Sequence, residues 1–232
     1  MFSYEENIVV KTAFASWNVL VHLLMGVIVA IPLLFAVVKD FNATSAPEDI
    51  IMIHILLCVL GYQLLMSQSF LSLCPYNTWS SGLSRRHQKR AHWVIQLLGC
   101  GMAIAGSIII MIYKDVNFNT LHGKLGLTAL FFTIVNLMTG VAALFAEPLN
   151  KYIPSYVSKL LHIVLGIVAF ACASSCLCYG FNKNSFRTWT NDRVTTGVIA
   201  FTSIFTVIIL INPLITTCKK IIHLIKYIRN DI

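Results

Sequence analysis

The chain has 232 residues, of which 57% are hydrophobic and only 11% are charged. Soluble domains carry roughly 25% charged residues, so this composition excludes an ordinary soluble protein and indicates a polytopic membrane protein. The net charge of +8 does not indicate a nucleic-acid partner, because the basic residues cluster in short connections between apolar runs. In such places they set membrane topology and meet anionic lipid headgroups.

Six apolar runs are long enough to cross about 30 Å of hydrocarbon at about 1.5 Å per residue. In chain order they cover residues 14–38, 50–73, 92–112, 122–146, 160–181 and 195–216. The sequence therefore predicts an all-α membrane protein with one six-helix domain over residues 14–216. An N-terminal segment, 1–13, precedes it, and a basic amphipathic tail, 217–232, follows it. No glycine-rich dinucleotide motif is present, and the short connections leave no room for a nucleotide-binding domain.

The distribution of lysine and arginine predicts that both termini are cytosolic. With that orientation 11 basic residues lie on the cytosolic side and six on the opposite side, as the positive-inside rule requires. The sequon Asn42-Ala-Thr44 then falls in the first outer loop. The protein is expected in an endomembrane (endoplasmic reticulum or vesicle) or in the plasma membrane, and the sequence does not distinguish between them.

Four histidines lie close to the start of the second to fifth runs: His54, His92, His122 and His162. An ionisable side chain within hydrocarbon is costly, so each of them calls for a partner. Because successive helices alternate in direction, His54 and His122 are predicted near the outer face, and His92 and His162 near the cytosolic face. The sequence thus predicts one pair of histidines in each leaflet.

The chemistry of these pairs favours haem over zinc. Two imidazoles, with no cysteine or carboxylate beside them, would leave a tetrahedral zinc site half filled. Two axial imidazoles complete the coordination of a haem iron, which then transfers single electrons and binds no further ligand. Helices two to five are therefore predicted to form a four-helix di-haem bundle with the irons about 20 Å apart across the membrane. Gly126 and Gly166, one turn after His122 and His162, would leave room for a flat macrocycle.

The sequences around three of these histidines resemble the cytochrome b561 family. They are "RAHWVIQLLG" around His92, "LHGKLGL" around His122 and "KLLHIVLGIVAF" around His162. The "LSRRHQKRAHW" segment is most similar to the cytochrome b561 domain-containing (D1/D2-type) transmembrane reductases. The resemblance implies two haem b groups, cytosolic ascorbate as electron donor, and monodehydroascorbate or ferric iron as acceptor. It also implies that His54 and His122 hold the outer haem, and that His92 and His162 hold the inner one.

Two departures from the family pattern concern the surroundings of the ligands. Family members often carry proline after the first ligand, where this chain has Ile55. The Leu-His-Ser-Trp pattern of vesicular members is replaced by Leu-His-Gly-Lys at residues 121–124. Details of the family's substrate sites therefore do not transfer to this chain.

Candidate substrate residues follow from charge, because ascorbate is a monoanion. On the cytosolic side they are Arg85, Arg86, Lys89, Arg90 and Lys159, although the positive-inside rule alone also explains basic residues there. On the outer side Lys114 and Lys124 flank the His122 haem. His22 lies within the first run, as either a structural hydrogen-bonder or a contact of haem or substrate.

Two other classes of protein carry intramembrane histidines. A flavin-linked ferric reductase is disfavoured because the chain has no nucleotide-binding domain. A haem-free six-span transporter or metal permease would be expected to have acidic residues or broken helices near the midplane, whereas every Asp and Glu here lies in a terminus, a loop or at a span end. The sequence leaves open whether the protein forms a homodimer.

Overall fold

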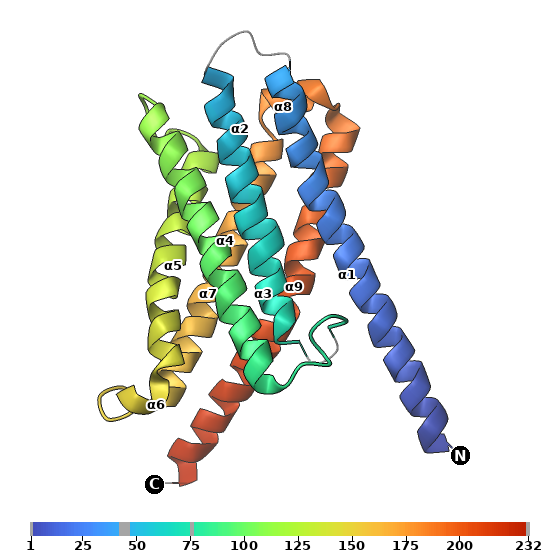
Figure 1. Ribbon diagram of the computed structural model, residues 1–232, viewed down its shortest axis with the longest axis vertical. Helices are drawn as coiled ribbons and strands as arrows, with labels where there is room; N and C mark the ends of the chain where they lie inside the picture. Colours follow the sequence, from blue (N-terminus) through green and yellow to red (C-terminus); the bar gives the residue numbers. More distant parts are fainter. Residues whose placement is uncertain (1, 42–46, 75–76, 231–232) are drawn as a thin grey trace.

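The computed structural model describes residues 2–41, 47–74 and 77–230, and every regular element within these ranges is helical (Figure 1). Six rods make up the bundle, and the second of them changes from α-helix to π-helix and back. The rods are α1 (Phe2–Phe41), α2 (Pro47–Cys58) with η1 (Val59–Met66) and α3 (Ser67–Ser72), α4 (Arg85–Tyr113), α5 (Leu121–Leu144), α7 (Ser155–Phe181) and α9 (Asp192–Asn230). Short helices α6 (Ala146–Leu149) and α8 (Asn184–Trp189) lie in the connections.

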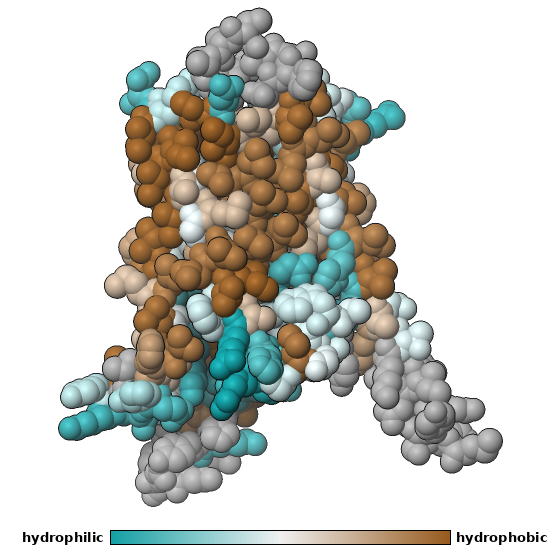
Figure 2. Space-filling view, in the orientation of Figure 1, coloured by the Kyte–Doolittle hydropathy of each residue, from teal (hydrophilic) through white to brown (hydrophobic). Residues whose placement is uncertain are grey.

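The predicted all-α membrane fold is confirmed. Within the described residues, six helices are long and apolar enough to cross a membrane. Large apolar side chains point outward along them, as Ile112 (80% exposed) and Met138 (68% exposed) do. Figure 2 shows hydrophobic residues over the middle of the molecule, with hydrophilic residues gathered toward its two ends. The apolar side chains therefore face lipid on the outside of the bundle as well as each other in its interior.

Polar side chains mark where two of the histidine-bearing helices begin. The Thr120 hydroxyl accepts a hydrogen bond from the Gly123 amide (3.2 Å), and the Ser84 hydroxyl accepts one from the His87 amide (3.5 Å). These contacts satisfy amides that a helix start leaves without an intrahelical partner. As a result α5 begins directly before His122 and α4 begins two turns before His92, which places both histidines toward one end of their helices.

At both ends of the described residues, helix continues past the predicted spans. The described ends of α1 and α9 lie at the same end of the bundle (Figure 1), as an even number of spans requires. The predicted tail at 217–232 begins within α9, which continues without a break to Asn230. Pro32 and Pro213 lie inside α1 and α9, which membrane helices tolerate.

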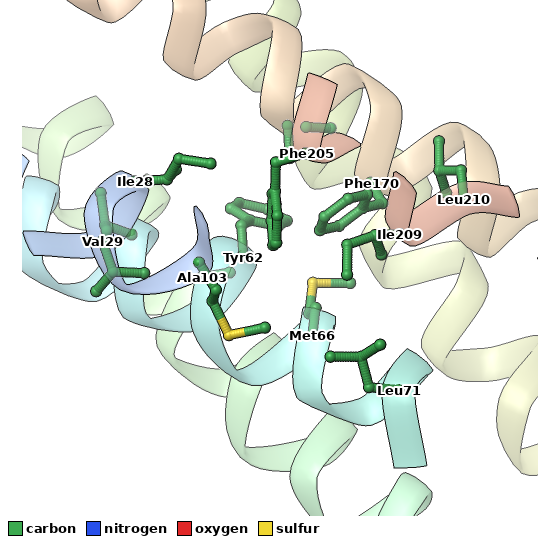
Figure 3. Packing of buried hydrophobic residues seen from close by; sticks show 14 of the residues in the cluster. Ile28, Val29, Tyr62, Met66, Leu71, Ala103, Phe170, Phe205, Ile209 and Leu210 are labelled. Atoms are coloured by element: carbon green, nitrogen blue, oxygen red, sulfur yellow. The ribbon is translucent and has the colours of Figure 1, made fainter. Parts of the chain in front are cut away.

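Small residues allow the second rod to approach α4 closely. A Cβ atom added at Gly61 would lie 2.7 Å from the Gly99 carbonyl oxygen and 2.8 Å from the Ala103 backbone nitrogen. Around this contact, Tyr62 and Met66 of η1 pack in one cluster with Phe170 of α7 and Phe205 of α9 (Figure 3). The π-helical segment thus lies at the centre of the bundle, packed against helices on several sides.

Candidate functional site

The structure brings the four histidines together in two pairs. His54 on α2 faces His122 on α5, with ring centroids 6.3 Å apart and ring planes at 89°. His92 on α4 faces His162 on α7, with centroids 6.2 Å apart and planes at 84°. Each pair therefore joins one histidine from the α2–α4 hairpin to one from the α5–α7 hairpin.

In each histidine, Nδ1 donates a hydrogen bond to a backbone carbonyl of the neighbouring helix in the same hairpin. The Nδ1···O distances are 2.9 Å for His54 to Gly106, 2.9 Å for His122 to Cys176, 3.0 Å for His92 to Ser69 and 3.3 Å for His162 to Asn136. Because a carbonyl oxygen only accepts, the proton of each neutral ring lies on Nδ1. The Nε2 lone pair of every ring is left available as a metal ligand.

The spacing within each pair fits a single metal ion. Two metal–nitrogen bonds of about 2 Å each, added to the half-widths of two imidazole rings, separate the ring centroids by roughly 6 Å. No group of three or more His, Cys, Asp or Glu side chains within the described residues could hold a metal ion. Each pair thus offers two protein ligands, which suits an iron whose other four positions are filled by a porphyrin.

A cavity of about 290 Å³ opens at the His54/His122 pair. Its walls are mainly apolar, and it reaches inward to Tyr62 and Gln63 of the π-helical segment. At its mouth, polar lining residues come from the connection between α4 and α5 and from the connection after α7 with the start of α8: Lys114, Asn117, Asn119, Thr120, Lys183 and Ser185. An apolar slot with a polar, basic mouth suits a flat macrocycle that carries carboxylates at one edge.

Two cysteines lie beside the outer pair, where the sequence predicted none. Cys58 Sγ is 3.5 Å from His54 Nδ1, and Cys176 Sγ is 3.3 Å from His122 Nδ1. The expectation was wrong because Cys58 follows His54 by one turn of the same rod, and Cys176 comes from α7, which the sequence does not place next to His122. Both sulfur atoms contact Nδ1, which already donates to a carbonyl. They therefore pack against the side of each ring opposite to Nε2 and do not complete a tetrahedral metal site.

The His92/His162 pair lies beside oxygen atoms rather than sulfur atoms. The Ser69 hydroxyl donates to the His92 carbonyl (3.1 Å) and accepts from His92 Nδ1 (2.8 Å). One turn from the ligands, Gln96 Oε1 and Ser158 Oγ are buried and make no hydrogen bond within the described part of the chain. A buried polar atom without a partner costs about 1–3 kcal/mol, so these atoms fit a site completed by a bound polar group.

Two glycines that the sequence analysis did not single out give the rings their space. A Cβ added at Gly140 would lie 3.0 Å from His162 Cε1, and one at Gly180 would lie 3.3 Å from His122 Cε1. Gly140 follows His122 along α5 at the same spacing as Gly180 follows His162 along α7, a repeat that the sequence does contain.

The two glycines that the sequence did single out face other groups. A Cβ at Gly166 would meet the Asn136 amide nitrogen at 3.1 Å, whereas Gly126 lines the outer cavity and would meet only Cys176 Sγ, at 3.4 Å. Of these two glycines, only Gly126 borders the cavity beside a histidine pair.

The basic candidates that the sequence predicted on the cytosolic side differ in their partners. Arg85 donates to the Leu73 carbonyl (3.2 Å) and to Gln88 Oε1 (2.9 Å), and Lys159 pairs with Glu147 at 3.1 Å. Three basic residues of the first two turns of α4 are exposed and have no partner among the described residues: Arg86, Lys89 and Arg90. These three are the ones free to meet an anion.

On the opposite side, Lys114 lines the cavity as its position suggests, but Lys124 is exposed and does not. Lys183, which was not among the sequence-predicted substrate residues, lines the cavity instead. His22 stands apart from both pairs, because its Nδ1 lies 2.8 Å from the Asn18 carbonyl of its own helix.

Comparison with known proteins adds to this geometry. The sequence pattern of eukaryotic cytochrome b561 matches residues 53–187, more than half of the chain and all four histidines. A mouse protein named transmembrane reductase CYB561D2 is 29% identical over 148 residues, covering 62% of this chain and 64% of that protein. The bovine protein is 29% identical over 149 residues (62% and 65%), and the human one 30% over 131 residues (55% and 59%). The similarity thus spans less than two thirds of the length of each relative.

Proposed function

Because this chain belongs to the cytochrome b561 family, whose members are haem b proteins, we propose that it holds two haem b groups and carries electrons across the membrane. His54 and His122 would ligate one haem, and His92 and His162 the other. The observation that carries the proposal is the repeated geometry of the pairs: centroids 6.2–6.3 Å apart, with every Nδ1 directed at a carbonyl.

The protein fixes the orientation of the histidine ligands and the distance between the two proposed haem sites. Each histidine pair would hold one haem, which would supply one-electron transfer. The carbonyl acceptors fix the tautomer and the ring plane of each ligand, which also raises its basicity. His122 and the Asn136 turn that contacts His162 are separated by about 21 Å along α5 at 1.5 Å per residue. The two sites together therefore span much of a hydrocarbon layer of about 30 Å.

Ascorbate on the cytosolic side is the proposed electron donor. Arg86, Lys89 and Arg90 lie within two turns of His92 and have no partner among the described residues. Their ammonium and guanidinium groups suit a monoanion, whereas Arg85 and Lys159 are already engaged. The proposed acceptor on the opposite side is monodehydroascorbate or ferric iron.

An absorbance spectrum of the purified protein before and after addition of ascorbate tests the proposal. We expect two haem b groups per chain by pyridine haemochrome assay, both reduced by ascorbate in the detergent-solubilised protein. A colourless protein would contradict the proposal and return the haem-free transporter as the leading hypothesis. If dithionite reduced the haem but ascorbate did not, the proposed cofactor would stand and the proposed electron donor would be wrong.

The Gly140→Ala variant is expected to lose haem from the inner site. The added methyl would lie 3.0 Å from His162 Cε1, so the ring must shift by a few tenths of an ångström from its place opposite His92. We expect the haem-to-protein ratio to fall from two toward one. Gly197→Ala is the matched control, because a Cβ at Gly197 meets nothing within 4 Å. Equal haem content in both variants would show that the ring does not need this space.

A further inference from the structure

One residue beside each histidine pair makes the same three contacts with its histidine. The Ser69 hydroxyl on α3 donates to the His92 carbonyl (3.1 Å) and accepts from His92 Nδ1 (2.8 Å), and the Ser69 carbonyl lies 3.0 Å from that nitrogen. Cys176 on α7 repeats the pattern at His122. Its thiol donates to the His122 carbonyl (3.2 Å), its sulfur lies 3.3 Å from Nδ1, and its carbonyl lies 2.9 Å from Nδ1. The two arrangements thus differ in one atom, which is oxygen at one pair and sulfur at the other.

The exchange of oxygen for sulfur changes which group accepts the Nδ1 proton. At His92 the Ser69 hydroxyl oxygen is the nearer acceptor, and the Ser69 carbonyl is shared with Ser72, whose hydroxyl donates to it at 2.6 Å. At His122 the order is reversed, because the Cys176 carbonyl is nearer than the sulfur. Sulfur is a weak hydrogen-bond acceptor. The His92 ring therefore donates to two oxygen atoms, and the His122 ring donates in effect to one.

The second histidine of each pair does not cancel this difference. His54 Nδ1 has Cys58 Sγ at 3.5 Å in addition to its carbonyl acceptor. His162 Nδ1 lies 3.3 Å from the Asn136 carbonyl. Among the described residues, Ser69 therefore supplies the one hydroxyl that contacts a proposed ligand ring.

The strength of the hydrogen bond at Nδ1 determines how basic the ring is at Nε2. A ring whose Nδ1 proton is held more strongly by an acceptor carries more negative charge and is a better electron donor to a metal. Such a ligand stabilises the ferric form of an iron over the ferrous form, so it lowers the reduction potential. Ser69 is fully buried, and a hydrogen bond away from water is electrostatically stronger than one in water.

We propose that Ser69 and Cys176 are positioning residues that set the reduction potentials of the two haem sites in opposite directions. The Ser69 hydroxyl lowers the potential at the His92/His162 pair, and the Cys176 sulfur leaves a higher potential at the His54/His122 pair. This inference rests on the proposed function, because it requires a haem at each pair. The resulting difference in electron affinity favours the proposed direction, from the His92/His162 pair toward the His54/His122 pair.

Reciprocal exchange of the two atoms tests the proposal. The variants are Ser69→Cys and Cys176→Ser, and each changes one atom while keeping a hydrogen-bonding side chain of similar size. The matched controls are Ser67→Cys and Cys178→Ser, the same substitutions on the same helices. Ser67 is also fully buried, and within the described ranges neither control residue hydrogen-bonds to a histidine.

The midpoint potentials are measured by redox titration of the purified protein, with each haem followed by its own EPR signal. His54→Ala, which is expected to retain only the inner haem, assigns the two signals. We expect Ser69→Cys to raise the ferrous-to-ferric ratio of the inner haem about fivefold at a fixed ambient potential, on the order of one net hydrogen bond. Cys176→Ser should lower that ratio at the outer haem by a similar factor, and the controls should match the wild type.

Opposite shifts, each confined to one haem, would not arise from a general loosening of the bundle. Unchanged potentials in both variants, shifts of the same sign, or equal shifts in the controls would overturn the proposal. If Ser69→Cys lost the inner haem, Ser69→Ala, which adds no volume, must raise the same potential, and a wild-type value there would also overturn it.

The haem content of the wild type is measured first and reports on the proposed function. A wild type without haem would overturn that function. Two haems whose potentials did not respond to the exchanged atoms would overturn only the role of Ser69 and Cys176.

Discussion

Replacement of His92 by alanine is expected to lower the haem content from two groups per chain to one and to abolish reduction by ascorbate from the cytosolic side. His92 would supply one of only two protein ligands to the inner iron, because no third His, Cys, Asp or Glu joins it within the described residues. The remaining haem would lie beyond direct reach of the donor, about 21 Å deeper along the bundle axis. Haem assay and initial ascorbate-reduction rates in sealed vesicles measure both effects.

His22 provides a matched control for this variant. It is also a histidine within a span, but its Nδ1 contacts the Asn18 carbonyl of its own helix at 2.8 Å. His22→Ala should retain both haems and the ascorbate rate. His54→Ala should lose the outer haem while ascorbate still reduces the inner one. Full haem content in His92→Ala would show that the pairing is wrong.

Substitution of Gly61 by alanine is expected to destabilise the bundle more than any other single methyl. The added Cβ would lie 2.7 Å from the Gly99 carbonyl oxygen and 2.8 Å from the Ala103 nitrogen, which are backbone atoms of α4. Backbone cannot move aside as a flexible side chain can, so the two helices must separate. Overpacking of this kind costs about 1–3 kcal/mol.

Thermal release of haem in detergent measures this effect, with Gly101→Ala as the control. Gly101 lies on α4 close to the same crossing, but a Cβ there meets nothing within 4 Å. We expect Gly61→Ala to lose haem at a clearly lower temperature, and Gly101→Ala to match the wild type. Identical curves for the two variants would mean that the π-helical segment can shift to admit the methyl.

The spans could be predicted from the sequence because bilayer thickness fixes their length and lipid fixes their composition. The two histidine pairs followed from the alternation of helix direction, which needs no knowledge of packing. The carbonyl acceptors, such as Gly106 and Cys176, could not be predicted, because they depend on the rotation of one helix against another. Any residue type can supply a carbonyl, so no sequence pattern marks these positions.

The outer lysines show a second limit. Lys124 is close to His122 in the sequence, and proximity in the chain made it a candidate. In the helix it lies on an exposed face, whereas Lys183 reaches the cavity from the loop after α7. A loop brings distant residues together through the whole fold, so its contacts are the last to be accessible from sequence.

The π-helical segment η1 explains a small irregularity in the histidine contacts. Three carbonyl acceptors follow the histidine of their own helix at one and the same spacing: Gly106, Asn136 and Cys176. Ser69 follows His54 at a spacing longer by a single position, and the π-helix at Val59–Met66 lies between them. A π-bulge accommodates one additional residue in a helix. The four helices thus share one histidine-to-carbonyl spacing once the single additional residue at η1 is allowed for, so superposing the first hairpin on the second requires a one-residue gap at η1.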